Sequence, residues 1–366
     1  MYRCSVYGTD KINQYEELIK VFLQPGEYEI SGVAEVPDDL PAKVSAEAPA
    51  KDPAGDTEKK TGSEMTWKMA TDASKDYPTT KALIKFADEV YEKSNGRIAV
   101  DVYESSILGD EVSYMEQLQA GTVDVAKLSL GTLSGLYEDT QVFLLPFLFK
   151  NNTEMWKVLE GEVGTMVKDG LNDYSIQGIG FTDNGSRCFY TTTEVDSLED
   201  FKGLPIRVQN NQLMNAMVSC LGGNPVNVSA NEVYSALQTG VCKGGENNPN
   251  IILSDSLYEV APYVLLDNHT TVMDVICMNL DLWNSLSDED KQIVNDAMAE
   301  ATKYDREIWD DSVEESIQKL KDGGATIVEP DDATLDTFRA AMDPVYAEYT
   351  EKYGEYMNAI NAALGK

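Results

Sequence analysis

The stretch GSRCFYTTTEVDSLEDFKGLPIRV, residues 185–208, contains two arginines at the edges of strand-like runs. CFYTT follows Arg187, and LPIRV contains Arg207 as its last residue but one. The planar guanidinium of arginine binds a carboxylate through two parallel N–H···O bonds, so an arginine held at a strand end can serve as an anion clamp. The alternative is a structural arginine paired with Asp or Glu, and spacing alone leaves both open.

Four motifs follow one another in this part of the chain. They are N-G-x-R at 184–187, L-x-D-F-K-G-L-x-I-R-V at 198–208, E-V-Y-x-A-L-Q-x-G at 232–240 and G-x-E-N-N at 244–248. In this order they resemble the solute-binding proteins of tripartite ATP-independent periplasmic (TRAP) transporters, the DctP family. The resemblance begins near residue 65 and extends to the C-terminus. It implies an α/β, periplasmic-binding-protein-like fold with two lobes and a long helix that spans both.

Composition narrows the classes of partner. The 63 acidic residues outnumber the 29 basic ones, for a formal net charge of -34. Nucleic acid and anionic membranes would repel such a chain, and an acidic ligand would need a local positive pocket. Five cysteines without C-x-x-C spacing and a single histidine argue against a zinc site. Because nucleophile and phosphate-loop motifs are absent from the sequence, we predict a binding protein without catalytic residues, metal or cofactor.

Residues 1–64 lie outside the resemblance. Residues 40–64 are rich in Ala, Pro, Lys, Asp and Glu, which predicts a disordered linker of the kind that separates a lipid anchor from a binding domain. The resemblance implies an extracytoplasmic location, yet the sequence given shows no basic-then-apolar export signal. We therefore expect an altered start that removed or replaced the signal, and we treat 1–64 as an atypical N-terminal segment.

Hydrophobic periodicity from residue 65 onward predicts alternating strands and helices. A strand at 66–71, a helix at 79–94 and a strand at 97–103 form an expected β-α-β unit, which implies parallel pairing. Further strands are expected at 123–130, 176–181, 263–266 and 272–280.

The longest helix is expected to follow Ser287, an N-cap candidate, and to run for about 35 residues or roughly 50 Å. A helix of that length would bridge both lobes. We expect one or two further helices after residue 331. The domain assignment is lobe I at 65–184 plus 273–310, and lobe II at 185–272 plus 311–366.

The resemblance implies that Arg207 forms a bidentate salt bridge with the ligand carboxylate. Arg187 matches an earlier arginine of the family, and two roles are open for it. It either offers the ligand a second donor or belongs to a structural charge cluster with Glu246 and His269. We expect these three residues to orient one another, although a lone histidine can equally be an ordinary core residue.

Six further polar residues are candidates for ligand contact. Asn247 matches the family asparagine that binds the ligand, but it can also be a turn residue. Asn210 and Asn211 follow Arg207 and are either readers of ligand hydroxyls or exposed residues at a helix N-terminus. A looser match on lobe I places three more side chains at pocket positions: Asp72, Glu111 and Ser129.

These expectations combine into a monomeric protein that captures a small organic acid and delivers it to TRAP membrane subunits. The polar set favours a sugar acid such as a uronate or aldonate. A C4-dicarboxylate or another monocarboxylate is the alternative, and a dicarboxylate would need a second cation, for which Arg187 is the obvious candidate. Two other classes stay open: a ligand-binding module that serves a sensor, and an enzyme on the same fold.

Overall fold

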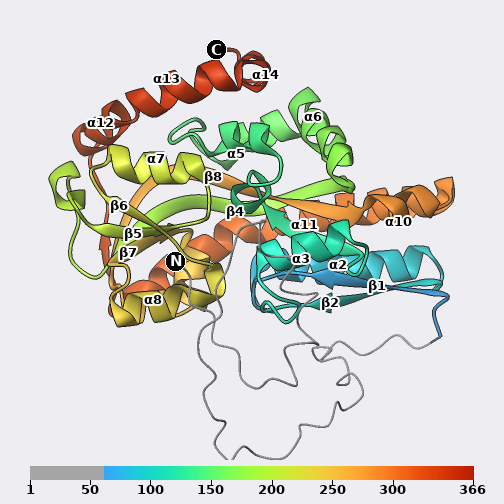
Figure 1. Cartoon of the computed structure of the whole chain (residues 1–366). Helices are drawn as coiled ribbons and strands as arrows, with labels where there is room; N and C mark the ends of the chain where they lie inside the picture. Colours follow the sequence, from blue (N-terminus) through green and yellow to red (C-terminus); the bar gives the residue numbers. More distant parts are fainter. Residues whose placement is uncertain (1–61) are drawn as a thin grey trace, which may run out of the picture. The chain divides into compact units, whose positions relative to one another are not determined.

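The computed structural model describes residues 62–366, which belong to the compact unit Pro53–Lys366. The expectations for the N-terminal segment and for most of the linker fall on residues 1–61, outside the described residues. Residues 62–366 form an α/β fold in which helices pack around one mixed sheet of nine strands (Figure 1).

The sheet runs through both ends of this unit. Its strand order is β2-β1-β3-β8-β4-β7-β5-β6, and β9 pairs with β8. The strands are β1 (Met65–Ala70), β2 (Ile98–Tyr103), β3 (Val125–Ser129), β4 (Ile176–Thr191), β5 (Pro205–Val208), β6 (Asn224–Asn227), β7 (Gly244–Asn247), β8 (Tyr263–Asn279) and β9 (Thr326–Val328). Strands β1 to β3 lie at the end of the sheet that we call lobe I, and β5 to β7 lie at the other end, lobe II (Figure 1).

The helices lie between and around these strands. The main ones are α2 (Pro78–Lys93), α3 (Glu111–Gln119), α4 (Leu130–Leu133), α5 (Asn152–Leu159), α6 (Glu162–Gly170), α7 (Gln212–Cys220), α8 (Val233–Thr239), α9 (Pro249–Ser254), α10 (Leu280–Ser285), α11 (Asp288–Asp322), α12 (Asp332–Ala341), α13 (Asp343–Lys352) and α14 (Gly354–Leu364). Within 62–366, none of them combines the length and apolar character that a membrane crossing requires.

The expected β-α-β unit is confirmed. Strand β1 pairs in parallel with β2, from Met65 opposite Ile98 to Ala70 opposite Tyr103. Helix α2 connects them and begins with a proline at its first turn, where the missing N–H would have no helical partner in any case. Its apolar residues at helical spacing face the sheet and are buried: Leu83, Phe86, Ala87 and Val90.

Strands β4 and β8 are longer than the sequence pattern predicted. The pattern divided each into shorter runs, whereas the structure has continuous strands of 16 and 17 residues that pair antiparallel. The polar residues in the middle of β8 broke the apolar pattern but stay in the ladder, where Thr270 pairs with Arg187. These two strands, together with α11, connect lobe I with lobe II.

Helix α11 has the predicted start and length. It spans 35 residues, and the Ser287 side chain accepts a hydrogen bond of 3.1 Å from the backbone N–H of Asp290. It packs against α2, β4 and α9. The C-terminal region holds three helices rather than one or two; α13 packs against α7, and α14 packs against α5 and α6.

Helix α11 is fixed to β4 where the register of the strand shifts, between Asp183 and Ser186. The Asp305 carboxylate accepts the backbone N–H of Asp183 at 2.6 Å. Gly185 adopts a φ of +71°, and a Cβ there would lie 2.6 Å from Cζ2 of Trp309. Only glycine fits this close approach, which explains the glycine of the N-G-x-R motif.

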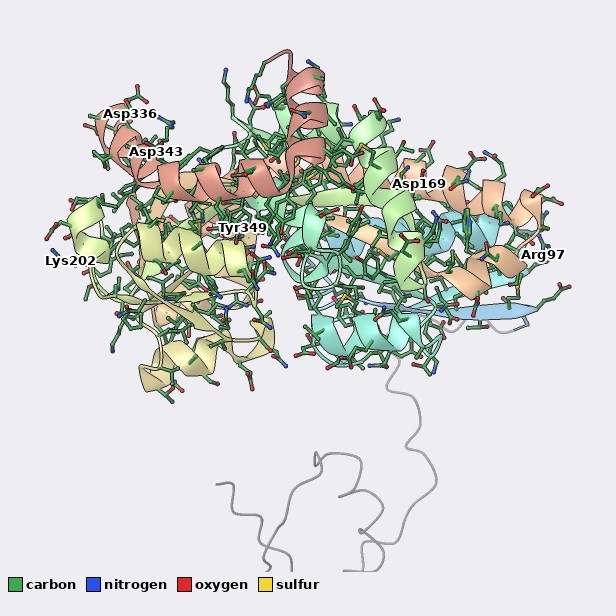
Figure 2. All side chains as sticks on the ribbon, turned by 45° about the horizontal axis from the view of Figure 1, so that its top comes forward. Arg97, Asp169, Lys202, Asp336, Asp343 and Tyr349 are labelled. Carbon is green, nitrogen blue, oxygen red and sulfur yellow. The ribbon has the colours of Figure 1, made fainter. Side chains whose placement is uncertain are left out.

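Much of the negative charge lies on outward-facing helix surfaces. Asp169 on α6, Asp336 on α12 and Asp343 on α13 are exposed and project away from the sheet (Figure 2). Carboxylates in these positions keep their hydration, so they act on other charged molecules through the long-range field.

Candidate functional site

A cleft of about 550 Å³ lies between the two lobes. Lobe I contributes Asp72, Asp110 and Glu111 to its lining, whereas lobe II contributes Arg207 and, just after it along the chain, Gln209. A cleft of this volume suits a ligand of small-molecule size. Its walls differ in charge, because acidic side chains line one side and a guanidinium lines the other.

Arg207 is the buried cation of the lobe II wall. It occupies the third position of β5 and is 3 % exposed. Its Nε donates to the backbone carbonyl of Val228 at 2.9 Å, and no ion pair to it is found among residues 62–366. Burial lowers the pKa of Arg207, although a guanidinium stays charged at neutral pH. A buried cation without a carboxylate partner is able to pair with an anion that enters the cleft.

Arg187 and Glu246 form a buried ion pair that takes up most of the arginine's donors. Nη2 donates to Glu246 Oε1 at 2.9 Å and to its backbone carbonyl at 2.7 Å, and Nε also contacts Oε2. Nη1 donates to Asn247 Oδ1 at 3.0 Å. Arg187 is not in the cleft lining described above. A ligand-binding role for it stays a prediction.

His269 completes the expected charge cluster. Its Nε2 lies 3.8 Å from Glu246 Oε2, and its Nδ1 lies 3.0 Å from Asp267 Oδ2. Burial lowers the pKa of His269, but the adjacent Asp267 and Glu246 outweigh it and raise that pKa to about 9. Burial raises the pKa of Glu246, and Arg187 outweighs it to give about 2. Arg187, Glu246 and His269 therefore lie together in one buried charge cluster, and their role around a ligand stays a prediction.

The three candidate asparagines have different environments. Asn210 is exposed and lines the cleft. Asn211 is buried, and its Oδ1 accepts from the backbone N–H of Met214 at 3.1 Å, so it caps α7. Its Nδ2 donates to Ser134, which ties α7 to the end of α4 and does not face the cleft lining. Asn247 Oδ1 accepts from Arg187, and Asn247 also lies outside that lining.

Glu111 and Ser129 belong to one hydrogen-bonded group on lobe I. The Glu111 carboxylate accepts from the backbone N–H of Ser129 at 2.5 Å, from its hydroxyl at 2.9 Å and from the hydroxyl of Thr132 at 2.5 Å. Glu111 and Thr132 line the cleft, whereas Ser129 lies behind them. The carboxylate is thus held in one orientation by its neighbours.

Lys127 is the residue of this wall that sequence reasoning missed. Its ammonium lies 2.6 Å from Asp72, 3.4 Å from Glu111 and 3.8 Å from Asp274, and the side chain is 5 % exposed. Burial lowers the pKa of Lys127, but the three carboxylates outweigh it and raise that pKa well above its usual value. Burial raises the pKa of Asp274 to about 7. A lysine between the apolar residues Ala126 and Leu128 was the available signal.

Gln209 is a second residue that the sequence did not single out. It lines the cleft from lobe II, and its Nε2 donates to Ser129 Oγ on lobe I at 3.1 Å. A Cβ added to Gly131 would lie 1.9 Å from Gln209 Oε1, so the side chain fills the space that glycine leaves. A further cross-cleft bond joins Ser229 Oγ to Asp110 Oδ2 at 3.1 Å. These bonds hold the lobes at the cleft spacing seen here.

Comparison with known proteins identifies the class to which this fold and cleft belong: two-lobe solute-binding proteins. The family described as bacterial extracellular solute-binding protein, family 7 (DctP) matches residues 69–352, and the chain belongs to it. A solute-binding protein of Chromohalobacter salexigens is 35% identical over 280 residues, covering 76% of this chain and 83% of the relative.

Two further relatives carry names that mention a ligand. The C4-dicarboxylate-binding periplasmic protein DctP of Rhodobacter capsulatus is 32% identical over 296 residues, covering 80% of this chain and 88% of the relative. A TRAP periplasmic solute binding protein of Roseobacter denitrificans, solved with bound β-D-glucuronate, is 33% identical with a TM-score of 0.78. That comparison covers 81% of this chain and 98% of the solved chain.

Proposed function

We propose that this protein captures a sugar acid, such as a uronate or aldonate, in the interlobe cleft and binds its carboxylate through Arg207. The observation that carries the proposal is a buried guanidinium in the cleft lining with no ion-pair partner among the described residues. Two charge-assisted bonds to a carboxylate would satisfy it, and ligands without an anion would leave it unpaired.

The other polar groups of the cleft suit a hydroxylated ligand. If Arg207 holds the carboxylate of the ligand, the rest of the ligand can reach other side chains of the cleft lining. Asp72 and Glu111 supply carboxylate acceptors there, and Asn210 supplies an amide. Asn247 and Arg187 would act from behind the cleft by orienting Glu246 and water. The related protein with bound glucuronate supports the same ligand class, and the related dicarboxylate-binding protein marks the alternative.

Family membership supports the cellular role. The loaded protein would act outside the cytoplasm, tethered by a lipid anchor or free, and would deliver its ligand to TRAP membrane subunits as a monomer. Closure of lobes connected by β4, β8 and α11 would accompany binding. We propose a binding role without catalysis or cofactor, because the family is one of solute-binding proteins.

Isothermal titration of the full chain with D-glucuronate tests this function. Replacing Arg207 by Ala should weaken binding at least about 30-fold, because truncating one member of a buried charge pair costs roughly 2–5 kcal/mol. Arg339, an exposed arginine on α12 that pairs with Asp336, provides the matched control, and Arg339→Ala should bind like the wild type. Unchanged glucuronate affinity in folded Arg207→Ala would refute the assignment.

A further inference from the structure

The lobe I wall of the cleft is negatively charged in spite of its lysine. Three carboxylates, those of Asp72, Glu111 and Asp274, surround the single ammonium of Lys127 at 2.6, 3.4 and 3.8 Å. Two more acidic side chains, Asp110 and Glu116, line the same side. Opposite them, Arg207 is the basic residue of the lining.

Lys127 is not available to a ligand as a second anchor. The side chain is 5 % exposed, whereas Asp72, its nearest partner, is 19 % exposed and lines the cleft. Asp72 therefore stands between the ammonium and the cavity. Glu111 is likewise committed, because Ser129 and Thr132 already donate to it. An anion that enters from the cleft meets the carboxylates and not the cation behind them.

This arrangement has opposite consequences for hydroxyl groups and for carboxylates. A hydroxyl can donate to a carboxylate oxygen, and Asp72, whose Oδ1 lies 2.6 Å from the Lys127 ammonium, is partly exposed in the cleft and can accept such a bond. A second carboxylate on the ligand offers no donor and is repelled by each like charge nearby. Burial strengthens that repulsion, since salt and water screen it less in a cleft than on the surface.

We infer that the Asp72–Lys127–Glu111 wall makes the protein selective for monocarboxylates with a hydroxylated far end and excludes dicarboxylates, with Asp72 as the residue that discriminates. The inference rests on the proposed function, because it assumes that Arg207 holds the first carboxylate. It deepens that function by stating which acids the cleft rejects. One relative is named as a C4-dicarboxylate-binding protein and another was solved with bound glucuronate, so members of the family differ in the acid that they bind.

The test compares D-glucuronate and D-gluconate with D-glucarate, which has the same number of carbons and a carboxylate at both ends. Titration of the full chain should give at least about tenfold tighter binding for the better of the two monoacids than for glucarate, as expected for one unfavourable charge contact in a partly buried site. Glucarate binding as tight as the monoacid would overturn the inference and leave the proposed function intact. Binding of neither monoacid would overturn the proposed function, and the inference with it.

Variants then identify the discriminating residue. Asp72→Asn removes one charge with little change in shape, and it should narrow the monoacid-to-diacid ratio by about threefold or more. Asp169 is exposed on α6 (Figure 2) and is not part of the cleft lining, so Asp169→Asn removes the same net charge and should leave the ratio unchanged. An unchanged ratio in Asp72→Asn, or equal narrowing in both variants, would refute the role of Asp72.

A second cleft variant keeps the inference testable if Asp72→Asn does not fold. Glu116 is exposed on α3 and lines the cleft, so Glu116→Gln should fold normally and narrow the ratio in the same direction by a smaller factor. Thermal unfolding of each variant without ligand shows whether it is folded before its ratio is interpreted. A folded Glu116→Gln with a wider ratio would contradict the electrostatic argument.

Discussion

Replacing Gly131 by Ala should weaken ligand binding without destabilising the fold. A Cβ at residue 131 would lie 1.9 Å from Oε1 and 2.7 Å from Cδ of Gln209, whereas ordinary contact begins at 3.4 Å. The amide group of Gln209 must therefore move as a whole, and it would lose its hydrogen bond of 3.1 Å to Ser129 across the cleft. One such bond contributes about 0.5–1.5 kcal/mol, which corresponds to roughly 2- to 12-fold weaker binding.

The free energy of unfolding should change less than the affinity, because the gain from alanine in a helix offsets the loss of the hydrogen bond. Residue 131 lies in helix α4, where alanine is favoured over glycine by up to about 1 kcal/mol, and the side chain of Gln209 is flexible enough to give way. Titration with D-glucuronate measures affinity, and thermal unfolding of the unliganded protein measures stability. We expect lower affinity together with a nearly unchanged melting temperature.

A double-mutant cycle with Gln209→Ala isolates the contact. In that background the obstructing side chain is absent, so Gly131→Ala should change affinity very little. Gly354→Ala is the matched control, because a Cβ at that helical glycine meets nothing within 4 Å and it lies on α14 away from the cleft lining. The reasoning is refuted if Gly131→Ala weakens binding equally with and without the Gln209 side chain.

Two further predictions concern stability. Ser287→Ala removes the hydroxyl that caps α11 by accepting the backbone N–H of Asp290. This change should lower the free energy of unfolding by about 1 kcal/mol in urea titrations. No change would mean that packing alone holds the first turn of α11. The pKa of His269 is about 9 in the folded protein and about 6.5 in the unfolded chain. Protonation of His269 therefore stabilises the folded protein fully below pH 6.5. This contribution, at most about 3 kcal/mol, is lost as the pH rises through 9. The unfolding free energy of the wild type should therefore fall more steeply from pH 6.5 to 9.5 than that of His269→Gln, and parallel curves would contradict a charged His269.

Local patterns predicted those parts of the fold that depend on local physics. Ser287 and the apolar spacing after it indicated where α11 begins, because capping and helical periodicity act within a few residues. The join between the two halves of β8 was missed because residues 267–271 are polar. All of them except Asn268 are buried, and His269 among them lies beside Glu246 of β7; a single strand's pattern does not contain that information.

In the candidate site, too, the sequence indicated what local motifs determine and missed what distant contacts determine. Arg207 was indicated by its motif, and the structure places it in the cleft lining without an ion-pair partner among the described residues. Lys127 and Gln209 escaped notice because their importance comes from distant partners; Gln209 meets Ser129 across 80 residues of chain. Asn211 was chosen for its place beside Arg207, but its side chain satisfies the start of α7 instead. Proximity in sequence was a poor guide where tertiary contacts determine which way a side chain faces.

The continuity of β4 and β8 has a consequence for attempts to take the protein apart. Strands β4 and β8 run through both lobes, so each lobe contains half of each strand. Dividing the chain between the lobes would truncate this antiparallel pair and expose the apolar surface that packs along α11. A fragment that contains one lobe should be insoluble or should associate with the other fragment. Two such fragments produced together should reassemble, and a reporter divided between them would sense their association.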